Sequence, residues 1–202
     1  MPEIPIVLLA AGGSSRMGKH KQLLPWGAVT LIEHQIKVLM QTREPVFVVL
    51  GCGYDEISPV LEHLKVRTVI NQDWEKGMGS SVAAGVREVL SILTGVEGML
   101  MALLDQPLIP VGHYSKLISL FQPGKSLIID SLSESGWEGV PAIFDKTYFD
   151  ELLKLQGETG ARQIIQKNRQ KVVSVKSNEI LEDIDTPEKY QLLLKKYLKN
   201  RI

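Results

Sequence analysis

A run of small residues followed by cations, near the start of the chain, has the composition of a chemical site. Gly12-Gly13-Ser14-Ser15 precedes three cations, Arg16, Lys19 and Lys21. Glycine lets the backbone curl so that successive N–H groups point inward, and such a nest favours phosphate oxygens. Arginine and lysine add charge-assisted hydrogen bonds to phosphate. The run therefore predicts an anion-binding loop whose natural ligand is a polyphosphate.

Two other phosphate-binding patterns fit this loop less well. Gly13 to Lys19 matches most of the P-loop pattern, but His20 stands where that loop needs a Ser or Thr hydroxyl. Pro25-Trp26-Gly27 would also stop the long helix that a P-loop requires. The dinucleotide fingerprint G-x-G-x-x-G is absent. A plain tight turn with solvated cations remains the bland alternative.

Two acidic motifs offer ligands for a cation shared with phosphates. Asp105 follows the apolar run 98–104, which predicts a buried strand, and ligands of open α/β sheets bind at the carboxyl ends of strands. Asp183 and Asp185 lie on one face of an extended segment, and carboxylate oxygens suit magnesium. Each motif has a structural alternative. Asp105 can cap a turn or helix, and Asp185-Thr186-Pro187 is an ordinary helix start.

A glycine-bearing segment, 71–81, follows another predicted strand. Gly77 and Gly79 allow the backbone to approach a ligand closely, and Ser80 is placed to cap a helix over 82–90. This arrangement suits recognition of the edge of a flat base. It also suits an ordinary strand-to-helix turn, and the spacing alone leaves both interpretations open.

The elements that must position these residues alternate between strand and helix. Apolar runs of strand length are separated by segments with apolar residues at helical spacing, which indicates a parallel sheet. The first predicted strand starts at Ile6, and the other predicted strands cover 46–50, 66–70, 98–104, 126–130, 140–144 and 171–175. The predicted helices cover 31–39, 55–64, 82–90 and 111–121, followed by one that ends near 155, one that starts at about 162 and one at the end of the chain. We expect an α/β fold with a mostly parallel twisted sheet and helices on both faces.

Composition sets further limits. The 202 residues fit a single domain, and 44% apolar and 23% charged residues are ordinary for a globular protein. Lysine plus arginine equal aspartate plus glutamate at 23 each, which argues against a broad nucleic-acid or membrane surface. A single cysteine, Cys52, fits a reducing compartment, and residues 1–5 lack the features of a signal peptide. We expect a cytoplasmic protein.

The loop also carries a family resemblance. Leu9-Ala10-Ala11-Gly12-Gly13-Ser14-Ser15-Arg16-Met17-Gly18, followed by Lys21 and Leu23-Leu24-Pro25, resembles the signature loop of nucleotidyltransferases with the sugar-phosphate nucleotidylyltransferase fold. Within that group it is most similar to the molybdenum cofactor cytidylyltransferases and their guanylyltransferase relatives. Matched segments run in family order from residue 7 to residue 190.

The resemblance implies a role for each motif. Arg16, Lys21 and Asp105 would be catalytic, and Asp105 and Asp185, favoured over Asp183, would bind Mg²⁺. The implied nucleotide-binding residues are Leu9, Ala10, Ala11, Gly12, Gly13, Ser14, Arg16, Met17, Gly18, Lys21, Asn71, Gly77, Met78, Gly79, Ser80 and Ser81. The implied acceptor-binding residues are Gln106, Gly139, Pro141 and Arg162. The N-terminal half would then bind the nucleotide and the C-terminal half the acceptor.

The implied reaction transfers CMP from CTP to the phosphate of molybdopterin-bound molybdenum, which releases pyrophosphate. Ala10-Ala11-Gly12 and Met78-Gly79-Ser80-Ser81 look more like the cytidylyl than the guanylyl branch. The product would serve a molybdenum hydroxylase such as xanthine dehydrogenase. The alternatives are a guanylyltransferase, a transferase acting on a sugar or other small phosphate, and a non-catalytic cofactor carrier. A carrier has no need for a pyrophosphate clamp and a metal.

Overall fold

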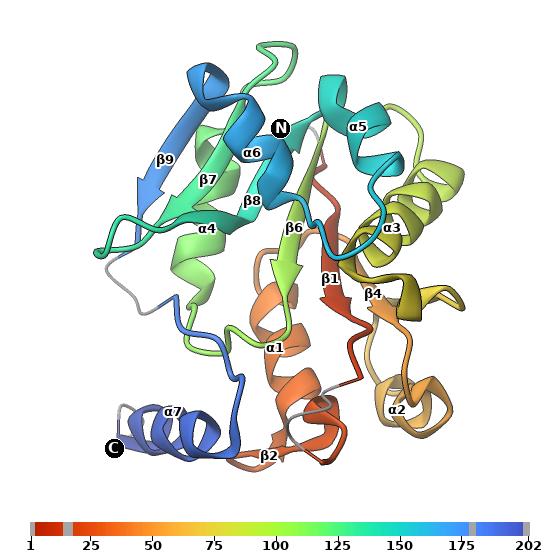
Figure 1. Cartoon of the computed structure of the whole chain (residues 1–202), viewed down its shortest axis with the longest axis vertical. Helices are drawn as coiled ribbons and strands as arrows, with labels where there is room; N and C mark the ends of the chain where they lie inside the picture. The colour runs from red at the N-terminus through yellow and green to blue at the C-terminus, as the bar shows by residue number, and fades with distance from the viewer. Residues whose placement is uncertain (1–2, 14–17, 178–180, 200–202) are drawn as a thin grey trace.

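The computed structural model describes residues 3–13, 18–177 and 181–199. Its centre is a seven-stranded sheet in the order β5-β4-β1-β6-β8-β7-β9 (Figure 1). The strands are β1 (Ile6–Ala10), β4 (Val46–Leu50), β5 (Arg67–Ile70), β6 (Gly98–Leu103), β7 (Ile128–Leu132), β8 (Glu138–Asp145) and β9 (Val172–Lys176). A short hairpin, β2 (Pro25–Trp26) with β3 (Val29–Thr30), lies apart from this sheet.

The sheet is mostly parallel, as predicted. Strands β5, β4, β1 and β6 pair in parallel, and so do β7 and β9. The exception is β8, which is antiparallel to both of its neighbours. Its reversed direction brings the start of β8 to the same edge of the sheet as the end of β6, since Met101 pairs with Ala142 and Gly98 with Asp145.

Helices cover both faces of the sheet, because alternate residues of a strand point to opposite sides. In β1, Ile6 and Leu8 belong to one buried cluster and Val7 and Leu9 to the other. The first cluster packs against α1 (Leu31–Met40), α2 (Tyr54–Leu61), α4 (Val111–Leu120) and α7 (Pro187–Lys199). The second packs against α3 (Met78–Ile92), α5 (Phe149–Leu153) and α6 (Arg162–Lys167). The predicted three-layer α/β fold is confirmed.

Two helix starts test local sequence reasoning. Helix α1 begins after Thr30, whose side chain forms a capping box with Glu33. The expectation that Ser80 caps the next predicted helix is wrong, because α3 already begins at Met78 with Gly77 as its N-cap. Ser80 lies in the first turn, where its hydroxyl is 2.8 Å from the Gly77 carbonyl oxygen.

An aromatic cluster attaches the C-terminal helix to the N-terminal part of the chain. The buried ring of Trp26 lies 5.1 Å from Tyr197 and 6.2 Å from Tyr190, measured between ring centroids. The Tyr190 hydroxyl donates a 2.6 Å hydrogen bond to the Pro25 carbonyl. These contacts place α7 beside β2 (Figure 1), and therefore fix the segment 181–186 that leads into it. No helix in the described ranges is long and apolar enough to cross a membrane.

Candidate active site

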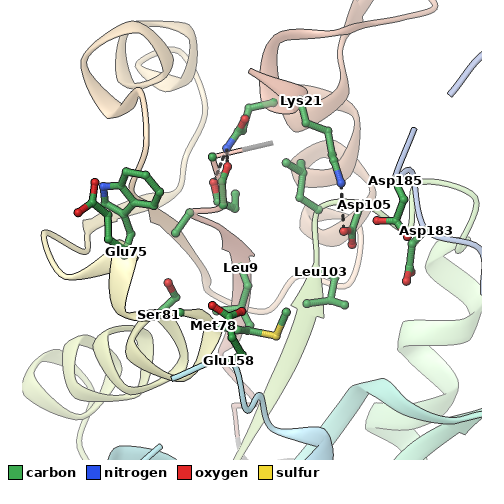
Figure 2. Close-up of a pocket in the computed structure, with 18 residues that line it drawn as sticks. Leu9, Lys21, Glu75, Met78, Ser81, Leu103, Asp105, Glu158, Asp183 and Asp185 are labelled. Carbon is green, nitrogen blue, oxygen red and sulfur yellow. Dashed lines mark hydrogen bonds and ion pairs between the residues drawn. The ribbon is translucent and has the colours of Figure 1, made fainter. Parts of the chain in front are cut away.

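A cleft of about 560 Å³ opens where β1 and β6 end. Its walls come from residues 9–13, from Lys21 and Gln22, from parts of 74–81, from 103–105, from Glu158, and from Asp183 and Asp185. Segments far apart in the sequence therefore meet at one edge of the sheet (Figure 2). This is the edge at which open α/β sheets bind ligands.

The side chain of Gln22 holds the glycine loop after β1 through hydrogen bonds to its backbone. This glutamine lies in the short 3₁₀ helix η2 (Lys21–Leu23) and is only 1% exposed. Its amide nitrogen donates hydrogen bonds of 2.7 Å to the Ala10 carbonyl and 3.2 Å to the Gly12 carbonyl. Sequence reasoning missed Gln22, because its role depends on the two carbonyl groups that its side chain contacts. The predicted residues Ser14, Arg16 and Met17 lie outside the described residues.

Lys21 and Asp105 form an ion pair in the cleft. The Lys21 Nζ lies 3.3 Å from the Asp105 Oδ2, and their side chains are 13% and 28% exposed. The other carboxylate oxygen, Oδ1, is buried and has no hydrogen-bond partner in the described part of the chain. Two residues predicted to act together, 84 positions apart in sequence, therefore lie in contact.

The Asp183–Asp185 segment lies against the Asp105 turn. The Ile184 backbone N–H donates to the Asp105 carbonyl at 2.8 Å, and the Gln106 side-chain amide donates to Asp183 at 3.0 Å. Figure 2 shows the three carboxylates beside Lys21. The pKa of Asp183 is raised to about 6, mainly by burial and also by the charges of Asp105 and Asp185, while the Gln106 hydrogen bond and the Lys21 charge oppose the rise. Negative charge is therefore concentrated here.

This donor set fits a divalent cation that is also bound by substrate. Within the described ranges, no three His, Cys, Asp or Glu side chains form a ready-made metal cluster. Asp105 nevertheless offers a buried oxygen without a partner, and Asp185 lines the same cleft. Magnesium and manganese are commonly bound by one or two carboxylates together with phosphate oxygens. The site therefore suits a cation that completes its coordination with a nucleotide.

The glycines of the predicted base-recognition segment pack closely against a distant loop. A Cβ atom on Gly79 would lie 2.6 Å from the backbone nitrogen of Gln156, and one on Gly77 would lie 2.4 Å from the backbone of Gly157. The Gly79 N–H also donates to the Gly157 carbonyl at 2.9 Å. These glycines therefore admit the α5–α6 loop, and this packing places Glu158 in the cleft wall.

Asn71 shapes the same segment from inside the protein. Its side-chain amide donates to the hydroxyls of Ser80 and Ser81 at 2.9 and 3.0 Å, and its oxygen accepts the Asp73 N–H at 3.0 Å. The side chain is buried and its hydrogen-bonding groups are used within the protein. Of the predicted base-binding residues, Gly77, Met78 and Ser81 line the cleft, whereas Asn71, Gly79 and Ser80 support it.

Trp74 forms a wall of the cleft that sequence reasoning did not single out. Its ring lies against the glycine loop, since a Cβ on Gly13 would lie 3.2 Å from the ring. A Cβ on Gly51 would lie only 2.5 Å from the Trp74 Cβ. Glu75 lines the cleft next to Trp74. Gly13 and Gly51 leave room for Trp74, but both are distant from it in sequence, so only the fold connects them to it.

The four predicted acceptor-binding residues lie outside the cleft lining. Gln106 is 1% exposed and is used on Asp183. The remaining three surround the start of β8: the Pro141 carbonyl accepts from Ser131 at 2.6 Å, Gly139 packs under the Trp137 ring, and the Arg162 Nε donates to the Glu138 carbonyl at 2.8 Å. Arg162 also stacks on Trp137, with its guanidinium carbon 5.2 Å from the ring centroid. Their role toward an acceptor stays a prediction.

The family model described as the MobA-like NTP transferase domain matches residues 6–172, so the chain belongs to this family. The family and the fold together define an enzyme of the nucleotidyltransferase class. The resemblance read from the glycine loop is thereby confirmed.

Three curated relatives match nearly the full chain. Purine catabolism protein PucB of Bacillus subtilis (strain 168) is 31% identical over 93% of this chain and 94% of its own length. Molybdenum cofactor cytidylyltransferase of Escherichia coli (strain K12) is 28% identical over 98% of both chains. A Paenarthrobacter nicotinovorans protein named nicotine blue oxidoreductase is 30% identical over 96% of this chain and 98% of its own.

A solved structure matches as well. The crystal structure of Rv0371c from Mycobacterium tuberculosis H37Rv superposes with a TM-score of 0.83 at 26% identity, covering 96% of this chain and 98% of that one. A crystal structure of Rv0371c in complex with manganese superposes with a TM-score of 0.76, with the same identity and coverage.

Proposed function

We propose that this enzyme transfers CMP from CTP to the phosphate of molybdopterin-bound molybdenum, forming molybdopterin cytosine dinucleotide and pyrophosphate. The observation that carries the proposal is the Lys21–Asp105 pair, which lies beside Asp183 and Asp185 at the end of the glycine loop. A cation, a set of carboxylates and a glycine-rich backbone at one sheet edge are the parts that phosphoryl chemistry needs. This chemistry depends mostly on positioning and charge neutralisation.

Each residue of the cleft would have a separate role in the transfer. The loop of Gly12 and Gly13 would wrap the triphosphate, and Lys21 and Arg16 would neutralise the charge that develops on the transferred and leaving phosphates. Asp105 and Asp185 would hold a divalent cation, Mg²⁺ in our proposal, which supplies Lewis-acid stabilisation of phosphate oxygens. The acceptor phosphate attacks the α-phosphorus of CTP directly, and pyrophosphate leaves with the bonding electron pair. The protein forms no covalent intermediate.

Two observations support CTP over GTP. The E. coli cytidylyltransferase matches 98% of this chain, whereas a relative named probable molybdenum cofactor guanylyltransferase, from Mycolicibacterium paratuberculosis (strain ATCC BAA-968 / K-10), matches 56% of it. The cleft is lined by Ala10 and Ala11, the residues that resemble the cytidylyl branch. The name of PucB, a purine catabolism protein, agrees with our proposal that the product serves a purine-oxidising molybdenum hydroxylase such as xanthine dehydrogenase.

We further propose that the acceptor binds next to the nucleotide, at the start of β8. Gly139, Pro141 and Arg162 lie there, at the sheet edge where β6 ends. Asp183 and Asp185 belong to the C-terminal half but line the cleft. The division into a nucleotide-binding half and an acceptor-binding half would therefore apply only to the other residues.

The lone Cys52 thiol supports a reducing, cytoplasmic setting.

A pyrophosphate-release assay tests the proposal. Each of CTP, GTP, ATP and UTP would be supplied with Mg²⁺, with and without purified molybdenum cofactor. We expect release with CTP that depends on both the cofactor and the metal. Release with GTP alone would support a guanylyltransferase, and release that needs a sugar phosphate would support a different acceptor. Binding of the cofactor without release from any nucleotide would support a carrier.

A further inference from the structure

Helix α1 buries one polar side chain in its apolar face. Gln35 is fully buried, among Leu31, Ile32 and Leu39, which are also fully buried. Burying a side-chain amide without hydrogen bonds is unfavourable. An amide at this position therefore needs hydrogen-bond partners, and these partners show which part of the chain Gln35 holds in place.

The backbone partners of Gln35 lie on both sides of Asp105. The Gln35 Nε2 donates to the Leu103 carbonyl at 3.0 Å and to the Gln106 carbonyl at 3.2 Å. Leu103 is the last residue of β6, and Gln106 follows Asp105. One amide group thus fixes where the chain leaves the strand and where it continues after the carboxylate.

The next contact along α1 extends this support. The His34 Nε2 lies 3.0 Å from the Pro107 carbonyl, so two successive α1 residues hold successive points of the same turn. The turn in turn places the second acidic segment, because the Asp105 carbonyl accepts the Ile184 N–H at 2.8 Å. A shift of the turn would therefore move Asp105 and Asp185 relative to the Lys21 ammonium.

We propose that Gln35 is a positioning residue for the divalent-cation site. By holding both carbonyls around Asp105, it sets the carboxylate geometry that the cation requires, without touching the cation or the substrate. The inference rests on the proposed function, since it assumes that Asp105 and Asp185 bind the metal. Residues that orient metal ligands in this way typically change metal affinity by about 10–100-fold when they are removed.

The variant Gln35→Met keeps the length and approximate volume of the side chain but removes both donated hydrogen bonds. Thr42→Val is the matched control, because Thr42 donates a 2.7 Å hydrogen bond to the Leu39 carbonyl at the other end of α1. The control loses helix hydrogen bonding without a contact to the Asp105 turn. Thermal denaturation of both variants would show that each one folds.

The direct readout is binding of Mn²⁺ alone, measured by the electron paramagnetic resonance signal of the free ion. We expect Gln35→Met to bind Mn²⁺ about tenfold more weakly than the wild type, and Thr42→Val to bind it as the wild type does. In the transfer assay, the Mn²⁺ concentration for half-maximal rate would rise by a similar factor, while the KM for CTP at saturating Mn²⁺ would change less than twofold.

Unchanged Mn²⁺ affinity in Gln35→Met, or an equal loss in Thr42→Val, would overturn the inference even if the wild type releases pyrophosphate from CTP. A wild type that binds no Mn²⁺ would overturn it as well. A wild type that binds Mn²⁺ but transfers no nucleotide would contradict the proposed function instead. In that case, weaker binding by Gln35→Met would still support the positioning role.

Discussion

At the scale of residues, the proposed chemistry depends on charges that the fold brings together. Lys21 and Asp105 are distant in sequence and 3.3 Å apart in space. The family resemblance implied that both belong to one site, and the position of Asp105 after a predicted strand agreed with this prediction. It could not predict Gln22 or Gln35, whose importance comes from the carbonyl groups they contact rather than from any local pattern.

Lys21→Met tests the ammonium directly. Methionine retains the apolar stem of lysine but removes the charge, so we expect kcat/KM for CTP to fall about 10²–10³-fold, as for the loss of one charge-stabilising donor. The free energy of unfolding should change by about 1 kcal/mol or less, because partly exposed pairs contribute little. Steady-state pyrophosphate release and urea denaturation measure the two effects.

The control for this variant is Lys37→Met. Lys37 lies 3.8 Å from Glu33 in a surface pair on α1, and its side chain is 46% exposed. The Lys37→Met substitution should leave kcat/KM for CTP unchanged. Comparable losses in both variants would mean that Lys21 acts only through general charge.

Asp130 provides a pH prediction away from the cleft. It is fully buried on β7, and burial raises the pKa of its carboxyl from 3.8 to about 6; the Ser174 hydroxyl opposes this rise and the charge of Glu138 adds to it. A raised carboxyl pKa means that the folded state retains a proton which the unfolded state has already lost. The stabilising contribution is therefore present below pH 3.8 and is lost as the pH rises through about 6.

Asp130→Asn cannot ionise, so its stability relative to the wild type should increase from pH 3.8 to about pH 6. The change in pKa limits the whole increase to roughly 3 kcal/mol. Urea denaturation of both proteins across this range isolates Asp130, because Asp183 titrates in both. A constant difference between the two proteins at every pH would show that Asp130 does not titrate there.

At the scale of elements, the sequence located the strands well and the contacts between loops poorly. The predicted strand 46–50 has the same bounds as β4, and the predicted strand at 126–130 is displaced by two residues from β7. Helix α3 begins earlier than expected because Gly77 and Gly79 admit the 156–158 backbone, a tertiary contact that no local pattern encodes.

Gly79→Ala tests this contact between elements. The added Cβ would meet the Gln156 backbone at 2.6 Å, so we expect a loss of about 1–3 kcal/mol in the free energy of unfolding. The α5–α6 loop carries Glu158 into the cleft, and its displacement should also raise the KM for CTP. Urea denaturation and steady-state kinetics measure both effects.

Gly112→Ala is a close control for this substitution. Gly112, like Gly79, is the second residue of its helix, but a Cβ there would meet nothing within 4 Å. Alanine favours helix, so this variant should be unchanged or more stable by up to about 1 kcal/mol. Equal destabilisation of the two variants would contradict the packing explanation.

At the scale of the whole molecule, segments near both ends of the chain line the cleft. The glycine loop comes from the first strand, and Asp183 and Asp185 come from the segment just before the last helix. Sequence reasoning predicted the α/β class and the sheet edge, because hydrophobic periodicity encodes both. It could not predict the attachment of α7, which depends on Trp26, His34, Tyr190 and Tyr197 meeting across the whole chain.

Trp26→Ala tests how far that attachment controls the site. Removing a fully buried aromatic ring should cost about 3–5 kcal/mol of stability. Because α7 follows the Asp183–Asp185 segment, we also expect weaker Mn²⁺ binding under conditions where the variant is folded. Tyr54→Ala, which truncates an exposed ring on α2, is the control. Wild-type Mn²⁺ affinity in a folded Trp26→Ala variant would show that the acidic segment is placed independently of α7.

We propose that a triphosphate and a divalent cation bind together at Lys21 and Asp105. Isothermal titration of CTP into the wild type and into Asp105→Asn, with Mg²⁺ and with EDTA, measures whether they do. We predict that Mg²⁺ strengthens CTP binding to the wild type at least tenfold and leaves binding to Asp105→Asn nearly unchanged. Equal CTP affinity in all four titrations would contradict the account.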